Sequence, residues 1–355
     1  MEVHALKDRR PGADPSLASA APFGAASPRK RVLASPVPAE GENGLFSQSW
    51  FPICLSTDIP KGGVIGRPFL DGKVVAFRGE DGIPRVMSAY CPHMGADLSI
   101  GAVVGNNIQC AFHKWEMNGD GWCEKTGVGD PAPKNACIYN FPTQERWGVV
   151  FAFNGDTPTW DLPDFKYPDD ELLVTVSPRI DFGADPWVFA ANTPDVAHLK
   201  TVHGLEGSHV VPEEDIRWFE HGFMYHSEWL HWGDKKLDWD IGIYGTSLFI
   251  QDGTLDGEWF GLAAPFGMPE PGKSFSYFIN VVHKGDGSDR SELRAKEWLR
   301  VSTNLEITFG MQDLNLLNTI HYRPGTLTRT DKFLGKFFDY LRAYPRAHPS
   351  SDFIR

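Results

Sequence analysis

The chain has 355 residues, of which 41% are apolar and 23% charged, and its formal net charge is −12. This length allows two domains, and the absence of an apolar run of about 18 residues predicts that no helix spans a membrane. The negative charge argues against an extended nucleic-acid-binding face. The N-terminus lacks the apolar core of a secretory signal, and the five cysteines fit metal ligation in a reducing compartment, so we expect a cytoplasmic protein.

Residues 1–44 are rich in Ala, Pro, Ser, Gly and Arg without a sustained apolar period, which predicts a mobile tail. The acidic residues Glu2, Asp8 and Asp14 argue against a transit peptide. From Trp50 the sequence changes to short apolar runs broken by Gly and Asp, for example 73–77 and 148–153. This pattern predicts a small all-β domain over residues 46–156.

Residues 157–170 contain three prolines and four aspartates and are predicted to be a linker to a second domain, 171–355, that mixes strands with a few helices. One helix is expected from Thr193 through His198, with Pro194 in its first turn. A second is expected over about 305–320, and a third over about 331–344. Apolar residues on one side of the last two helices are Phe309, Leu316, Leu317 and Ile320, and then Phe333, Phe337 and Leu341.

Two pairs of metal-binding residues stand in the first domain. Cys91 and His93 form a C-x-H pair, and Cys110 and His113 form a C-x-x-H pair 16 residues later. Two thiolates on one iron and two imidazoles on the other would make a Rieske [2Fe–2S] centre, whose reduction potential lies well above that of an all-cysteine ferredoxin. The alternative is a Cys2His2 zinc site, although C-x-H fits the usual zinc spacing poorly.

The other three cysteines, Cys54, Cys123 and Cys137, have no comparable histidine partners in the sequence. A free cysteine is among the residue types most often buried, and it packs as a small apolar side chain. We therefore expect these three to be buried and to play no part in binding the metal.

The second domain contains D-x2-H-x4-H, formed by Asp195, His198 and His203. Asp195 and His198 are three residues apart and would share a helix face. His198 and His203 are five apart, which is about 140° around an ideal helix. Both can bind one metal only if the helix widens or breaks between them, and Gly204 could help end it. The sequence therefore predicts a local irregularity at this point.

Two imidazoles and one carboxylate form the facial triad of mononuclear Fe(II) oxygenases. The best third ligand is Asp313, because it lies within an otherwise apolar stripe where an unpaired carboxylate would be costly to bury. A helical aspartate bonded to a neighbouring side chain is the alternative, and Glu306 is the second choice as ligand. For Asp195 the alternative is a first-turn residue stabilised by the helix dipole.

The segment 91–99, Cys-Pro-His-Met-Gly-Ala-Asp-Leu-Ser, resembles the Rieske domain of ring-hydroxylating oxygenases. So does Cys110-x-x-His113-x-Trp115, which a Gly-Asp-Gly turn follows before Cys123. Two positions depart from the family pattern: Ala111 stands where Pro is usual, and Lys114 where Gly is common. Neither is a ligand position, so the departures concern the packing of the loop.

The same family carries N-x-x-D-x-x-H-x4-H and a later carboxylate in its catalytic domain. Matching positions here are Asn192, Asp195, His198, His203 and Asp313. The resemblance is closest to oxygenases built from α subunits alone, such as ketosteroid hydroxylases and arylamine oxygenases. It implies an α+β fold, in which an all-β Rieske domain precedes a helix-grip-like catalytic domain with an antiparallel sheet. It also implies a head-to-tail homotrimer, in which Asp195 bridges an iron histidine to a Rieske histidine of the neighbouring subunit.

The function that this resemblance implies is that of an oxygenase component with a [2Fe–2S] cluster and a mononuclear Fe(II). It would take electrons from a separate reductase, with or without a ferredoxin, because no nicotinamide or flavin motif is present. O2 and an apolar organic substrate, such as a steroid or a natural-product ring, would be hydroxylated, demethylated or desaturated; small betaines are a further substrate class. The rival functions are a Rieske-type electron carrier without catalysis and a zinc-stabilised β domain fused to a ligand-binding domain.

Overall fold

The computed structural model describes residues 35–231 and 235–355. Residues 1–34 of the predicted tail lie outside the described residues. Every helix and strand named below belongs to one compact unit, formed by Val37–Tyr322 with Leu327–Arg355. Within the described residues, no helix is long and apolar enough to cross a membrane.

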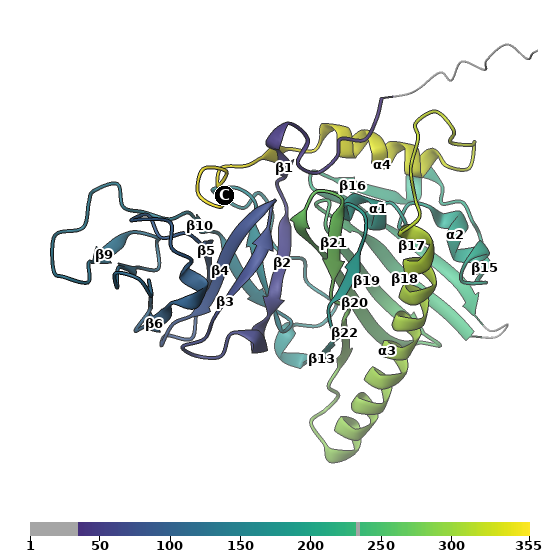
Figure 1. Cartoon of the computed structure of the whole chain (residues 1–355). Coiled ribbons are helices and arrows are strands. Elements are labelled where there is room, and N and C mark those ends of the chain that lie inside the picture. The colour runs from purple at the N-terminus through teal and green to yellow at the C-terminus, as the bar shows by residue number, and fades with distance from the viewer. Residues whose placement is uncertain (1–34, 232–234) are drawn as a thin grey trace, which may run out of the picture. The chain divides into compact units, whose positions relative to one another are not determined.

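The first part of the described chain is all-β (Figure 1). Its strands are β1 (Phe46–Ser47), β2 (Trp50–Leu55), β3 (Val64–Phe69), β4 (Gly72–Arg78), β5 (Pro84–Ser88), β6 (Ala102–Val104), β7 (Asn107–Gln109), β8 (Glu116–Met117), β9 (Cys123–Lys125), β10 (Asn140–Phe141), β11 (Thr143–Arg146) and β12 (Val149–Phe153). Eleven of them form three antiparallel sheets in the orders β10-β5-β4-β3, β11-β12-β2 and β6-β7-β8-β9, and β1 pairs with β23 (Arg346–Ala347). The strands predicted over 73–77 and 148–153 are confirmed as β4 and β12.

The second part is built on a ten-stranded antiparallel sheet whose central order is β13-β22-β20-β19-β18-β17-β15. Its strands are β13 (Leu172–Val176), β14 (Ile180–Phe182), β15 (Glu206–Gly207), β16 (Ile216–Phe219), β17 (Gly222–His231), β18 (Lys235–Tyr244), β19 (Leu248–Leu255), β20 (Glu258–Glu270), β21 (Lys273–Ser276) and β22 (Ile279–His283). The helices are α1 (Pro186–Ala190), α2 (Val196–Thr201), α3 (Asp289–Leu317) and α4 (Lys332–Ala343), and β23 (Arg346–Ala347) follows them. The expected α+β fold with an antiparallel sheet is confirmed, and the division into domains at 46–156, 157–170 and 171–355 stays a prediction.

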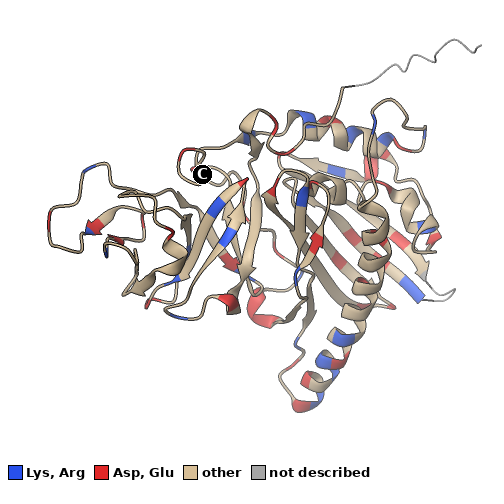
Figure 2. Cartoon of the chain, viewed as in Figure 1, with Lys and Arg blue, Asp and Glu red and all other residues tan. Residues whose placement is uncertain are grey.

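The helix predicted over 305–320 is the C-terminal half of a longer helix, α3, which begins at Asp289 and packs on β13, β20 and β22. Its first half is rich in charged residues (Figure 2) and buries few apolar ones, so the sequence there shows no apolar stripe. Phe309 and Leu317 are buried as expected, but Ile320 lies beyond the helix end and is exposed. The predicted helix 331–344 is confirmed as α4.

Two sequence expectations about smaller features are only partly correct. The helix expected from Thr193 begins at Val196, and the proline at a first helical position is Pro186 of α1. Of the three cysteines expected to be buried, Cys54 is, whereas Cys123 and Cys137 are half-buried.

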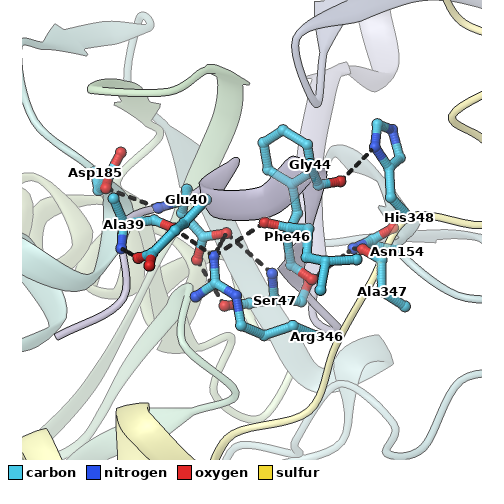
Figure 3. Close-up of polar contacts among 12 residues, drawn as sticks. Ala39, Glu40, Gly44, Phe46, Ser47, Asn154, Asp185, Arg346, Ala347 and His348 are labelled. Carbon is cyan, nitrogen blue, oxygen red and sulfur yellow. Dashed lines mark hydrogen bonds and ion pairs between the residues drawn. The ribbon is translucent and has the colours of Figure 1, made fainter.

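A buried polar network joins the N-terminal segment to the chain's C-terminus (Figure 3). Glu40 is 2% exposed and its carboxylate accepts hydrogen bonds from the amide and hydroxyl of Ser47. Burial raises the pKa of Glu40, and the Arg346 guanidinium, 3.4 Å away, counteracts this. Asp185 accepts a hydrogen bond from the amide of Glu40. The end of the predicted tail segment is therefore packed against the second part of the chain.

Asn154 holds this junction together through one amide group. Its Nδ2 contacts the carbonyl oxygens of Phe46, Ser47 and Ala347 at 3.1, 3.1 and 2.9 Å. We expect Asn154→Ala to lower the free energy of unfolding by about 1–3 kcal/mol, because it removes donors from buried acceptors. Urea denaturation measures this. The exposed Asn140→Ala is the control, and equal losses in both variants would contradict the assignment.

Candidate metal centres and cavity

The four predicted cluster ligands lie on two facing loops. Cys91 and His93 follow β5, and Cys110 and His113 lie between β7 and β8. Both thiols are buried, at 3% and 1% exposed, whereas His93 is exposed and His113 half-buried. The two imidazole rings are 4.6 Å apart by their centroids. The structure thus brings all four side chains together, with the thiols on the inside and the imidazoles on the outside.

Each loop is closed by its own backbone. The Cys91 amide donates to the Ala96 carbonyl at 2.9 Å, and the Cys110 amide donates to the Trp115 carbonyl at 2.8 Å. Lys114 has φ 58°, a left-handed backbone in which glycine is favoured. This explains why a glycine is common at this position of the family. The lysine here adopts the same backbone at a small steric cost.

The donor set fits a [2Fe–2S] cluster. Burial and, to a smaller extent, the adjacent Cys110 raise the pKa of Cys91 to about 11, so two neighbouring thiolates need a positive centre beside them. Trp115, the last residue of the motif that begins at Cys110, stacks on His93 at 4.4 Å with an angle of 8° between the rings. This contact holds the imidazole in one orientation.

The second site forms where α2 ends. α2 stops at Thr201, Val202 caps it and Gly204 has φ 69°, so His203 leaves the helix direction. The rings of His198 and His203 then lie 5.1 Å apart by their centroids. The expected irregularity between the two histidines is therefore present, as the end of a short helix.

Asp313 of α3 completes the group. Its Oδ1 lies 3.2 Å from His203 Nε2, and one ligand atom from each of His198, His203 and Asp313 lies within 4.8 Å of the others. Burial acts to lower the pKa of His203, but the hydrogen bond with Asp313 outweighs it and the net direction is upward. Burial lowers the pKa of His198. Two imidazoles and a carboxylate are the donor set of a mononuclear non-haem iron site, so these residues fit the metal.

Hydrogen bonds orient both imidazoles through their Nδ1 atoms. The Nδ1 of His198 lies 2.5 Å from the carbonyl oxygen of Asp195, and the Nδ1 of His203 lies 2.8 Å from Oε1 of Gln312. Such contacts fix the ring tautomer of a metal-binding histidine and leave Nε2 for the metal. Sequence reasoning missed Gln312, and the only signal for it was its place beside Asp313.

Asp195 is the N-cap residue of α2, so its place is not a helical position sharing a face with His198. Within the chain its carbonyl oxygen, rather than the carboxylate, contacts His198. The carboxylate makes no helix-capping hydrogen bond, and burial raises its pKa. Asn192, the other predicted neighbour of the site, lines the adjacent cavity.

An apolar cavity of about 120 Å³ opens beside His198, His203 and Asp313. Its wall is mainly aromatic and aliphatic, and it includes Phe182, Phe189, Trp239, Phe249, Leu262, Phe266, Phe278 and Phe309. Asn192, Thr193, Gln251 and Glu306 add polar groups to this wall. Glu306, the second choice as ligand, therefore lies in the cavity wall.

A second group with metal-binding residue types, His226, Glu228 and Asp238, lies on the solvent-facing side of strands β17 and β18. The ammonium of Lys236 lies 2.9 Å from Glu228 and 3.2 Å from Asp238. Because a lysine already pairs with both carboxylates, we assign no metal to this group.

Gln312 offers a direct test of how the site is oriented. We expect Gln312→Leu to weaken Fe(II) binding about 10–100-fold, because the variant loses the acceptor for His203 Nδ1. Gln312→Glu keeps an acceptor oxygen and should keep the affinity. Competition with an Fe(II) chelator measures both variants. A leucine variant that binds iron as tightly as the unmodified protein would show that this contact does not matter.

Comparison with known proteins supports both parts of the fold. Residues 49–142 match the model of the Rieske [2Fe–2S] domain. Curated relatives include cholesterol 7-desaturase from Bombyx mori, 32% identical over 179 residues, with 49% of this chain and 38% of the relative covered. The oxygenase component of 3-ketosteroid-9-alpha-monooxygenase from Mycobacterium tuberculosis is 26% identical over 266 residues, with 70% of this chain and 60% of the relative covered.

Solved structures extend the likeness to most of the chain. NdmA from Pseudomonas putida CBB5, solved with caffeine, matches with a TM-score of 0.64 at 17% identity, covering 82% of this chain and 89% of NdmA. Dicamba monooxygenase bound to dicamba matches with a TM-score of 0.59 at 16% identity, covering 83% of this chain and 97% of the other. At these identities the likeness shows the fold.

The chain therefore contains a Rieske [2Fe–2S] domain at residues 49–142, within the fold of Rieske oxygenases. The family resemblance that the sequence motifs indicated is confirmed. The chain spans only 38% and 27% of the lengths of two curated relatives, cholesterol 7-desaturase and a chlorophyllide a oxygenase from Chlamydomonas reinhardtii.

Proposed function

We propose that this chain is the oxygenase component of a Rieske non-haem iron oxygenase, which oxidises an apolar organic substrate with O2 and electrons from a separate reductase. One observation carries the proposal. His198, His203 and Asp313 converge within 4.8 Å beside an apolar cavity, in a chain that also contains a Rieske domain. The proposal includes hydroxylation, demethylation or desaturation as outcomes, a cytoplasmic location, and a ferredoxin as an optional intermediate carrier.

The proposed reaction uses two metal centres, and each is held by its own set of side chains. When bound, the cluster supplies single electrons and the mononuclear iron supplies O2 activation. His198 and His203 would offer their Nε2 atoms to the iron, because their Nδ1 atoms are engaged, and Asp313 would add one carboxylate. Three protein donors leave coordination positions for other ligands. The aromatic wall keeps water away from the reacting carbon and binds the substrate skeleton.

The cavity is lined by residues between Phe182 and Leu317, and none of its lining residues comes from 46–156. The cluster loops of the same chain therefore contribute nothing to the cavity wall. This supports the head-to-tail homotrimer that the resemblance implies, in which the cluster of one subunit serves the iron of the next. Asp195 would then bridge His198 to a Rieske histidine of the neighbouring subunit, using the carboxylate that caps no helix.

The cavity and the names of the relatives support the proposed substrate class. Cholesterol 7-desaturase and 3-ketosteroid-9-alpha-monooxygenase are named for steroids, and NdmA was solved with caffeine, a fused ring. A cavity of about 120 Å³ is comparable to the engineered protein cavity of about 150 Å³ that holds benzene. One ring therefore fits next to the triad, and a larger skeleton requires side chains of the wall to move.

The experiment is oxygen uptake with a surrogate reductase against a panel of sterols, fused aromatic rings and small betaines, with mass analysis of the products. We expect substrate-dependent uptake with an apolar member, and its loss in His198→Ala, while the cluster signal in electron paramagnetic resonance (EPR) stays. A panel in which no apolar member raises uptake rejects the apolar substrate class. Unchanged iron content in His198→Ala favours the alternative, an electron carrier without catalysis.

A further inference from the structure

A buried carboxyl–amide pair lies in the wall of the apolar cavity. Glu306 of α3 is 4% exposed and Gln251 of β19 is 3% exposed, and Gln251 Nε2 donates to Glu306 Oε1 at 2.7 Å. Both residues line the cavity. Burying a carboxyl costs several kcal/mol unless it is paired. Among the described residues, the Gln251 amide is the group that donates a hydrogen bond to the Glu306 carboxyl. Burying this polar pair in an otherwise apolar wall therefore costs folding free energy.

Glu306 lies on the same face of α3 as Asp313. Glu306, Gly310 and Asp313 follow one another at spacings of four and three residues, and all three line the cavity. Seven residues of helix separate Glu306 from Asp313, which is about 10 Å along the axis. A Cβ on Gly310 would lie 2.2 Å from the ring of Phe278, so the glycine lets that ring fill the space between them.

A further buried polar side chain, Asn280, lies two strands from Gln251 in the same sheet. Gln251, Leu262 and Asn280 are cross-strand partners on β19, β20 and β22, so their side chains point to the same face of the sheet. Gln251 and Leu262 line the cavity. Asn280 is 1% exposed, and both polar atoms of its side chain lack a hydrogen-bond partner among the described residues. Hydrogen-bonding capacity that the described residues do not use therefore lies in the sheet next to Leu262, behind the residues that line the cavity.

We propose that Glu306 and Gln251 anchor a hydroxyl group carried by an otherwise apolar substrate. The inference rests on the proposed function, since it takes the cavity to be the substrate site, and it adds the substrate's polar group. With Nε2 of Gln251 engaged, the pair presents mainly acceptor oxygens, which match the donating hydrogen of a hydroxyl. A ketone has no hydrogen to donate, so it would find a partner only in the protonated carboxyl or in the second N–H of Gln251.

A hydroxyl also suits either ionisation state of the carboxyl. Burial raises the pKa of Glu306 to about 7, while Gln251 and His203 act in the opposite direction. The hydroxyl donates to the carboxylate and accepts from the protonated carboxyl, so the contact survives the change. An ammonium group would pair only with the carboxylate. The anchor would hold the hydroxyl about two helical turns from Asp313 and so select which carbon of the skeleton faces the triad.

The test uses the iron-loaded protein without oxygen and three ring-sized probes, cyclohexanol, cyclohexanone and methylcyclohexane, with affinities from calorimetry. We expect cyclohexanol to bind about 10-fold more tightly than either of the other two. Glu306→Leu and Gln251→Leu should each abolish this preference, and Glu306→Gln should retain part of it. The matched control is Glu297→Leu, an exposed glutamate on the same helix, which should keep the full preference.

Equal binding of alcohol and hydrocarbon to the unmodified protein overturns the proposal, as does the absence of binding by all three probes. So does a preference that survives in both leucine variants, whose folding is checked by thermal unfolding. The readout is separate from turnover. If the protein consumes oxygen with substrate but shows no preference for the alcohol, only the proposed hydroxyl anchor is rejected. If it prefers the alcohol but holds no mononuclear iron, only the proposed oxygenase function is rejected.

Discussion

Replacing Asp313 by alanine is expected to remove the mononuclear iron completely while the Rieske cluster remains. Asp313 is the carboxylate 3.2 Å from His203 Nε2, and its loss would leave two imidazoles as the only protein donors. Iron content should fall by one equivalent per chain, and substrate-dependent oxygen uptake should fall to background. The measurements are metal analysis and EPR of the reduced cluster.

Glu306→Ala is the matched control, because Glu306 is a carboxylate on the same helix and was the second choice as ligand. Its carboxyl is engaged by Gln251, so the variant should keep the full iron content. Iron lost from Glu306→Ala and retained in Asp313→Ala would reverse the assignment of the third ligand.

Asp195→Ala is expected to leave both metal sites filled and to slow product formation by about 10–100-fold or more. The reason is that the Asp195 carboxylate caps no helix within its own chain and is proposed to bridge the two metal sites across a subunit interface. A single-turnover assay with a chemically reduced cluster measures the effect, because it removes the reductase from the comparison.

The control for this variant is Asp215→Ala, which replaces an exposed aspartate in the second part of the chain. Product formation there should match the unmodified protein. If Asp195→Ala also forms product at the unmodified rate, then the carboxylate does not couple the centres. Loss of iron from Asp195→Ala would instead show that the residue acts only by supporting His198.

The sequence was most informative where chemistry requires rare residues at fixed spacing. Cys91, His93, Cys110 and His113 are brought together as the motif predicts, because each pair occupies one short loop closed by its own backbone. The required break between His198 and His203 also followed from geometry alone, since five residues of ideal helix would point the rings apart. In the structure the helix ends at Thr201.

Helix boundaries were predicted less well, for two physical reasons. The residue before a proline disfavours helical backbone, so Thr193 and Pro194 stay outside α2 and Asp195 becomes its cap. The first half of α3 is stabilised by features that leave no apolar stripe, such as the pair Glu292–Lys296 on its exposed face. An apolar pattern therefore reveals only the half of α3 that packs on the sheet.

The contacts that orient the iron ligands could not be predicted from spacing. The backbone carbonyl of Asp195 carries no residue-specific signal, and Gln312 acts on His203 across 109 positions of the chain. The same holds for the pair of Gln251 and Glu306, which meets only when β19 and α3 pack together.

The most direct test of the central claim is the metal content of the intact chain, measured together with its EPR spectrum. The claim is that one chain holds a [2Fe–2S] cluster and a separate mononuclear iron. It predicts three irons per chain and a Rieske signal, falling to two irons with the same signal in His198→Ala. Two irons in both proteins, or zinc without a Rieske signal, would contradict it.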